Sequence, residues 1–164
     1  MKANHWYKFS FKSRPSSIFV YDSNFDQVIL IILFLLHWYF SLFCQSFFLH
    51  RYAAHQMFVM NPYWEKFFYF FTWLWQGSSY LSPRAYAILH RMHHAYSDTP
   101  QDPHSPHHTE NLFSMMWKTK NIYNDYFSFK LKPEDRFSKG IPNWNKFDSF
   151  ADSMLVRLAW GIFY

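Results

Sequence analysis

The sequence contains two groups of closely spaced histidines, and histidine is the most common metal ligand among the side chains. The downstream group is His90-Arg91-Met92-His93-His94. Each helical residue advances by about 100°, so His93 lies about 60° to one side of His90 and His94 about 40° to the other. Three imidazoles on one helix face are within reach of a single metal ion or of a close metal pair. Neutral imidazole suits iron, zinc and copper, so this group alone does not select the metal.

The upstream group is His50-Arg51-Tyr52-Ala53-Ala54-His55. Its two histidines are five residues apart, which on an ideal α-helix separates them by about 140°. They cannot bind one ion side by side unless the helix is distorted. Either the helix bends or ends between them, or each imidazole faces a different metal. The second alternative suits a site with two metal ions.

A turn-rich loop follows the downstream histidines, over Asp98-Thr99-Pro100-Gln101-Asp102-Pro103. Its two aspartates can accept the second N–H of a metal-bound imidazole, or can simply form turns, and both interpretations stay open. His104, His107 and His108 then repeat the H-x-x-H-H spacing. Prolines at 103 and 106 prevent the regular helix that gives this spacing its meaning, so we expect loop residues here.

A membrane-spanning helix is predicted over residues 28–49. Positions 27–50 contain no Asp, Glu, Lys or Arg, and a helix over 28–49 is about 33 Å long, enough for a bilayer core of about 30 Å. Residues 1–27 are polar and aromatic, and we expect them to form a leader on the membrane surface. The fold class is therefore an all-α membrane protein.

A second apolar helix is expected over about residues 63–82, and it is predicted to be interfacial or re-entrant. One full crossing would place the two histidine groups on opposite faces of the membrane. Two crossings need about 40 residues, but only the 34 residues at positions 56–89 separate His55 from His90. Gly77 and two following serines also interrupt the apolar stretch.

Composition supports a membrane location. A quarter of the 164 residues are aromatic, and Trp and Tyr collect at bilayer interfaces. The net charge of +5 comes from scattered bases, which argues against a nucleic-acid partner and favours anionic headgroups or substrate phosphates. Four basic residues precede the predicted span and twelve follow it, which places both histidine groups on the cytoplasmic side. A single cysteine, Cys44, excludes an internal disulfide.

The order H-x(4)-H, H-x-x-H-H and S-D-T-x-x-D-P-H-S-P beside a membrane segment resembles the integral-membrane fatty acid desaturases, the acyl-CoA (stearoyl-type) branch in particular. The resemblance runs from about Phe48 to His104. It implies two non-haem iron ions, dioxygen, and an external electron donor of the ferredoxin or cytochrome type, used to introduce a cis double bond into an acyl chain. It also implies five metal ligands: His50, His55, His90, His93 and His94.

The same resemblance suggests substrate contacts. Lys118 and Lys120, on a predicted surface helix over residues 111–120, would meet the phosphates of a coenzyme A headgroup, and Tyr86 matches an aromatic position of the family. The acyl-CoA branch usually has Arg-Asp directly before the second histidine box, whereas Ile88-Leu89 stand here. Acyl-CoA, acyl-carrier-protein and acyl-lipid substrates therefore stay open.

The family carries a third histidine box near its C-terminus, and the sequence does not contain it in the expected place. A further transmembrane helix is expected to start near residues 154–164, so residues 28–164 are interpreted as a partial desaturase domain. We expect this fragment alone to be inactive, because two six-coordinate irons have about twelve positions to fill. Two alternatives are a lipid or alkane hydroxylase on the same histidine scaffold, and a non-catalytic metal-binding membrane protein.

Overall fold

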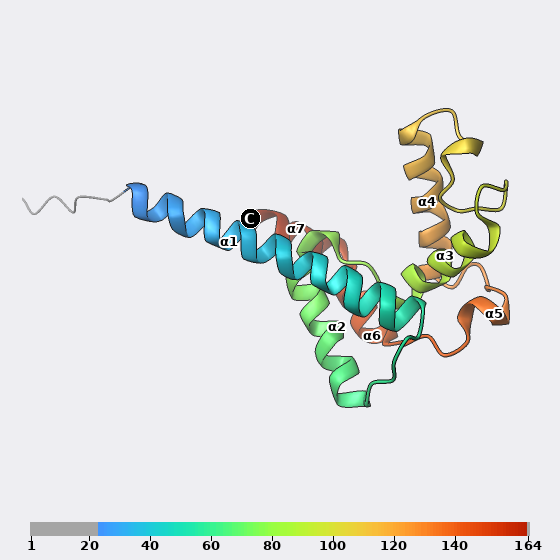
Figure 1. Cartoon of the computed structure of the whole chain (residues 1–164), viewed down its shortest axis with the longest axis horizontal. Helices are drawn as coiled ribbons and strands as arrows, with labels where there is room; N and C mark the ends of the chain where they lie inside the picture. The colour runs from blue at the N-terminus through green and yellow to red at the C-terminus, as the bar shows by residue number, and fades with distance from the viewer. Residues whose placement is uncertain (1–22, 164) are drawn as a thin grey trace, which may run out of the picture.

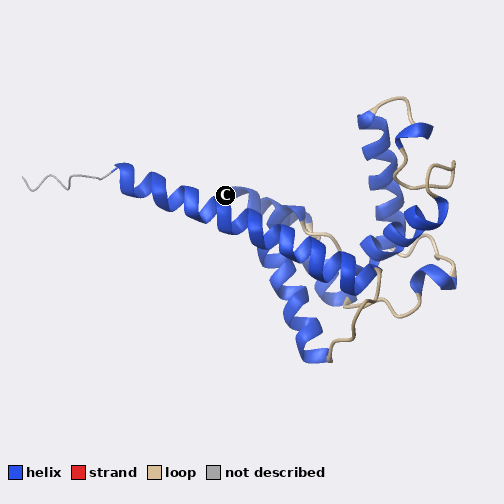
Figure 2. Cartoon of the chain, viewed as in Figure 1, coloured by secondary structure: helices blue, strands red, loops and turns tan. Residues whose placement is uncertain are grey.

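A computed structural model describes residues 23–163, and these residues form helices joined by loops and turns (Figures 1 and 2). Within this described part there is no strand. The chain is an all-α membrane protein, as its sequence predicts. Most of the expected surface leader, residues 1–22, and the last residue lie outside the described residues.

The first helix is the membrane-spanning element. Helix α1 (Ser23–Phe43) continues directly into η1 (Cys44–Ala54), and the 30 helical residues Phe25–Ala54 are long and apolar enough to cross a membrane. Every side chain of residues 28–36 is apolar and exposed, as expected for a helix surrounded by lipid. The predicted span over residues 28–49 is confirmed, and the helix extends beyond it at both ends.

Helix α2 (Pro62–Gln76) is the second apolar helix. It begins where the Asn61 side chain accepts a hydrogen bond from the Trp64 N–H at 3.0 Å, a common N-cap arrangement. It ends at Gly77, whose φ of 53° permits the chain to turn into η2 (Gly77–Ser79). Fifteen residues span only about 22 Å, less than the bilayer core of about 30 Å. The predicted helix over residues 63–82 is thus found, but it ends six residues early.

The remaining helices are joined by loops and turns. They are α3 (Pro83–Tyr96), η3 (Pro106–His108), α4 (Leu112–Phe127), α5 (Asp135–Ser138), α6 (Asn145–Ala151) and α7 (Met154–Phe163). A capping box starts α4, since Asn111 Oδ1 accepts from the Ser114 N–H at 2.9 Å and Ser114 Oγ accepts from the Asn111 N–H at 3.1 Å. The helix predicted over residues 111–120 therefore exists and runs seven residues further.

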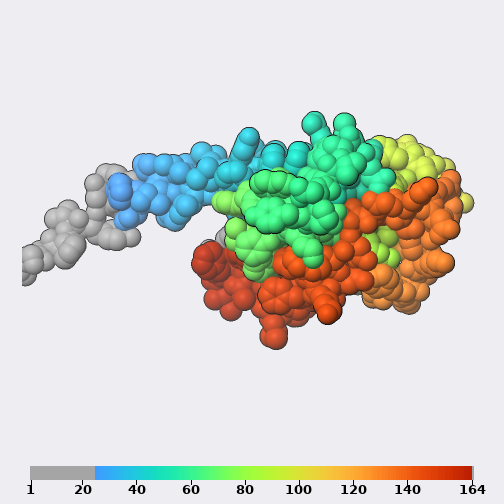
Figure 3. All heavy atoms as spheres, turned by 90° about the horizontal axis from the view of Figure 1, so that it is seen from below, coloured from blue at the N-terminus to red at the C-terminus, as the bar shows by residue number. Residues whose placement is uncertain are grey.

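Helix α3, which carries the second histidine group, lies with α4 and α5 at one end of the molecule (Figure 1). Figure 1 shows α3, α4 and α5 at the end opposite the start of α1, whereas α7 runs back toward that start. Helix α2 packs against the second half of the long helix, with the Phe40 and Trp75 rings 4.6 Å apart and the Phe48 and Tyr69 rings 5.3 Å apart. Seen from below, α2 lies beside the C-terminal helices (Figure 3), where Tyr69 contacts Trp144.

Gly140 follows α5 in a left-handed conformation, with φ of 70°. Replacing Gly140 with Ala is expected to lower the free energy of unfolding by about 1 kcal/mol, because a side chain disfavours this conformation. The added Cβ would also lie 2.1 Å from the Gln56 amide nitrogen. Chemical denaturation in detergent micelles measures the change.

Gly161→Ala is the matched control, because Gly161 lies within α7 and its added Cβ meets nothing within 4 Å. This variant should gain about 0.5 to 1 kcal/mol from higher helix propensity. Equal effects of the two substitutions would contradict the explanation.

Candidate metal centre

A widened helical turn brings the first two histidines together. From Cys44 to Ala54 the helix is a π-helix, in which the backbone N–H of a residue bonds the carbonyl five positions earlier. The His55 N–H accordingly donates to the His50 carbonyl at 3.0 Å. Residues five apart then lie on the same side of the helix, and the two imidazole rings are 4.5 Å apart. The helix is thus distorted between His50 and His55, in the way that their spacing requires for a shared site.

Small residues allow α3 to approach this widened turn closely. Ala53 and Ala54 of η1 pack with Ala87 of α3 in one buried cluster, and methyl side chains keep the two backbones near each other. Two histidines of α3 then meet the two of η1, with the His90 ring 4.7 Å from that of His50.

Four imidazoles form one group. Their ligand atoms all lie within 4.8 Å of one another, and the members are His50, His55, His90 and His94. The Nε2 atom of His90 is 3.0 Å from the Nε2 atoms of both His55 and His94. Nitrogen atoms from two helices therefore converge on one point, which is the donor arrangement that an imidazole-bound metal ion needs.

The electrostatic environment favours the neutral ring at two of the four histidines, His90 and His55. Burial, together with the neighbouring imidazoles, lowers the pKa of His90 to about 4. Burial first, and then the charges of His50, His94 and Arg91, lowers the pKa of His55 as well. The neutral ring is the form that binds metal, so His90 and His55 are in the metal-binding form at neutral pH.

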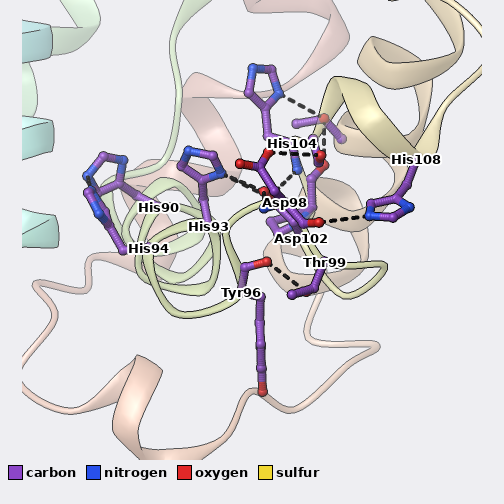
Figure 4. Close-up of polar contacts among 12 residues, drawn as sticks. His90, His93, His94, Tyr96, Asp98, Thr99, Asp102, His104 and His108 are labelled. Carbon is purple, nitrogen blue, oxygen red and sulfur yellow. Dashed lines mark hydrogen bonds and ion pairs between the residues drawn. The ribbon is translucent and has the colours of Figure 1, made fainter.

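His93 lies outside this group and faces Asp102 instead. Its Nδ1 atom lies 2.9 and 3.0 Å from the two carboxylate oxygens of Asp102 (Figure 4). Asp102 is fully buried and also accepts the backbone N–H groups of Asp98 and His104. Burial raises the pKa of this carboxyl, but the hydrogen bonds from the His104 N–H, His93 and the Asp98 N–H outweigh it and hold the pKa below its usual value. Asp102 fixes the orientation of the His93 ring through its Nδ1 atom, so that the Nε2 atom of His93 can bind a metal ion.

The later histidines belong to the loop. His104 Nδ1 lies 3.1 Å from the Thr119 hydroxyl, and His108 Nε2 lies 2.8 Å from the Asp98 carbonyl (Figure 4). His107 Nε2 is 3.6 Å from an Asp98 carboxylate oxygen. Residues 106–108 form a single 3-10 turn, so the helical H-x-x-H-H geometry is not present there.

A cavity of about 800 Å³ lies next to His90 and His93. Its wall combines apolar, aromatic and cationic side chains from α3 and the segment before it, α4 and α7: Leu81, Tyr86, Leu89, Met116, Lys120, Tyr123 and Arg157 among others. The Tyr86 ring stacks on His90, with centroids 5.6 Å apart and an angle of 14°. Two of the three predicted substrate residues, Tyr86 and Lys120, thus line this cavity.

Lys118, the third predicted substrate residue, is not among the residues that line this cavity. Its ammonium donates to the Asp102 carbonyl at 3.0 Å, so it braces the loop that carries Asp102. The alanines that allow η1 and α3 to approach were not identified from the sequence. The signal was present, because Ala53-Ala54 and Ala87 stand within or beside the two histidine boxes.

Comparison with known protein families identifies a match over most of the chain. The sequence model described as fatty acid desaturase matches residues 27–164. No curated protein and no solved structure matches the chain.

The four-histidine group predicts a measurable metal affinity. Replacing His94 with Ala removes one of the four donors, so cobalt(II) should bind at least about 100-fold more weakly. Loss of a residue that only hydrogen-bonds to a metal ligand already weakens metal binding about 10- to 100-fold. Titration of the purified chain in detergent, followed by the visible absorption of bound cobalt, measures the change.

His108→Ala serves as the control, because its ring bonds the Asp98 carbonyl outside the group. The assignment fails if the His94 variant binds cobalt as tightly as the wild-type chain does.

Proposed function

Because the chain belongs to the fatty acid desaturase family, we propose that it is an oxygen-dependent membrane desaturase that introduces a cis double bond into an acyl chain. The observation that carries this proposal is the convergence of four histidine ligand atoms within 4.8 Å at the end of a membrane-spanning helix. The proposed cofactor is a pair of non-haem iron ions, and bound iron supplies the activation of dioxygen.

The residues fit such a cofactor by their chemistry. The four grouped imidazoles would hold one iron, and His93, oriented by Asp102, would offer its Nε2 atom to the second. This division assigns all five predicted ligands to two metals. Two six-coordinate ions have about twelve positions, so the rest would come from water, substrate or other ligands.

The cavity beside His90 and His93 would receive the acyl chain. Apolar side chains such as Leu89 would contact the acyl chain, and the stacked Tyr86 ring would help to aim the chain at the metals. Lys120 would bind a phosphate of the substrate, which favours acyl-CoA or an acyl lipid with an anionic headgroup. Lys118 would contribute by holding the Asp102 loop.

The remaining proposals concern the surroundings of the site. The excess of basic residues after the span favours a cytoplasmic position for the histidines. An electron donor of the ferredoxin or cytochrome type would supply the electrons.

Two other functions use the same scaffold. A lipid or alkane hydroxylase would start with the same hydrogen abstraction, so histidine spacing does not separate it from a desaturase. The S-D-T-x-x-D-P-H stretch favours the desaturase. A non-catalytic protein would hold a structural metal at the four histidines.

Replacing the His94 codon with an alanine codon in the natural gene tests the reaction in the host cell. We expect one or more monounsaturated fatty acids to disappear from the cellular lipids and their saturated precursors to accumulate, because the iron site loses a ligand. Gas chromatography with mass spectrometry of total fatty acid methyl esters measures both.

The His108→Ala replacement is the control and should leave the fatty acids unchanged. Loss of hydroxylated lipids would identify the hydroxylase instead. An unchanged lipid profile in the His94 strain, with zinc in the purified protein, would contradict both enzymatic functions and support the structural metal.

A further inference from the structure

Arg91 joins two separate segments of the chain through four hydrogen bonds. It stands between metal-binding candidates on α3, yet its guanidinium points to backbone carbonyls. Nε donates to the Ala54 carbonyl at 2.7 Å and NH2 to the Ala53 carbonyl at 3.3 Å. NH1 donates to the Lys139 and Phe137 carbonyls at 2.9 and 3.3 Å.

The first two carbonyls lie at the end of the π-helix that carries His50 and His55. The last carbonyls of a helix need donors from outside it, and a cation there also complements the helix dipole. The N–H groups of residues 55–57 turn back to the carbonyls of His50, Tyr52 and Arg51. The carbonyls of Ala53 and Ala54 therefore point past the last turn, where they accept hydrogen bonds from the guanidinium of Arg91.

The other two carbonyls brace the guanidinium from the opposite side. They belong to the end of α5 and the residue after it. The Lys139 carbonyl also accepts the Gln56 side-chain amide at 3.1 Å. Three pieces of chain thus meet at one point: the end of η1, helix α3 and the turn after α5.

We infer that Arg91 is a positioning residue for the metal centre. Its guanidinium fixes the end of η1 against α3, and so holds His50 and His55 at the spacing from His90 and His94 that a shared metal ion requires. The inference rests on the proposed metal site. Arginine suits this role because its planar fork of five donors reaches both segments at once, whereas a lysine ammonium has no such fork.

A purely structural arginine would behave differently. Loss of four hydrogen bonds would then lower stability without changing the site in the molecules that stay folded. A positioning residue changes the site itself, so the affinity for a metal ion and the ligand geometry around that ion must change in folded protein.

Cobalt(II) titration of the full chain in detergent separates the two roles. We compare wild type with Arg91→Met and Arg91→Lys, at a temperature at which each is folded by circular dichroism. Arg91→Met should bind cobalt about 10-fold or more weakly, the usual range for groups that orient metal ligands, with a changed visible absorption spectrum. Arg91→Lys should fall between it and wild type.

Arg84→Met is the matched control. Arg84 lies on the same helix, and its NH1 donates to the Tyr126 carbonyl at 2.7 Å, which joins α3 to α4 away from η1. This variant also loses a bond between helices, but it should keep the wild-type cobalt affinity and spectrum.

Several outcomes would overturn the inference. Wild-type affinity and spectrum in both Arg91 variants would leave the metal site intact and assign Arg91 a structural role only. An equal loss of cobalt affinity in Arg84→Met would mean that any hydrogen bond between α3 and a neighbouring helix affects metal binding as much as those of Arg91. If Arg91→Met does not fold, Arg91→Lys decides by the same criterion. Failure of the wild-type chain to bind cobalt would refute the proposed metal site, and the inference with it.

Discussion

The spacing of His50 and His55 is the constraint on which the rest of the site depends. In an α-helix this spacing turns the two rings about 140° apart, so one metal ion could not use both. The chain meets the constraint by widening the helix over Cys44–Ala54, where the His55 N–H reaches back five residues to His50. π-Helical turns are rare in proteins, and those that occur are frequently found at functional sites. Here the widening has a direct chemical consequence, because it makes one binding surface from two separated ligands.

Packing on two sides supports this unusual turn. On one side Phe48 and Leu49 are fully buried against Tyr69 of α2, and the Tyr52 hydroxyl donates to the Glu65 carboxylate of the same helix. On the other side the alanine cluster and Arg91 hold η1 against α3. Each neutral hydrogen bond contributes about 1 kcal/mol and each bond to a charged group somewhat more. A geometry that is locally unfavourable is thus stabilised by contacts with both neighbouring helices.

The sequence predicts the helices well where local signals are strong. The charge-free run identifies the span, and the glycine at position 77 explains the end of α2. For His50 and His55 the sequence leaves two alternatives open, a helix that bends or ends between them or a different metal for each. It does not predict the widened turn, because that turn depends on contacts with helices distant in sequence. Helical geometry put His93 on the same face as His90 and His94. It did not reveal that His93 faces Asp102, because that contact depends on a loop turned by Asp98, whose φ is 60°. The bonds of Arg91 to the α5 segment likewise join residues more than forty positions apart.

X-ray absorption spectroscopy of the iron-reconstituted chain would test the central claim most directly, since outer-shell scattering counts the imidazoles bound to the metal. At one equivalent of iron per chain, the geometry predicts an iron with four imidazole ligands, the number of histidines in the group. An average of only one or two imidazoles per iron at this loading would mean that His50 and His55 serve different metals, and would contradict the account. Oxygen-only coordination would contradict it as well.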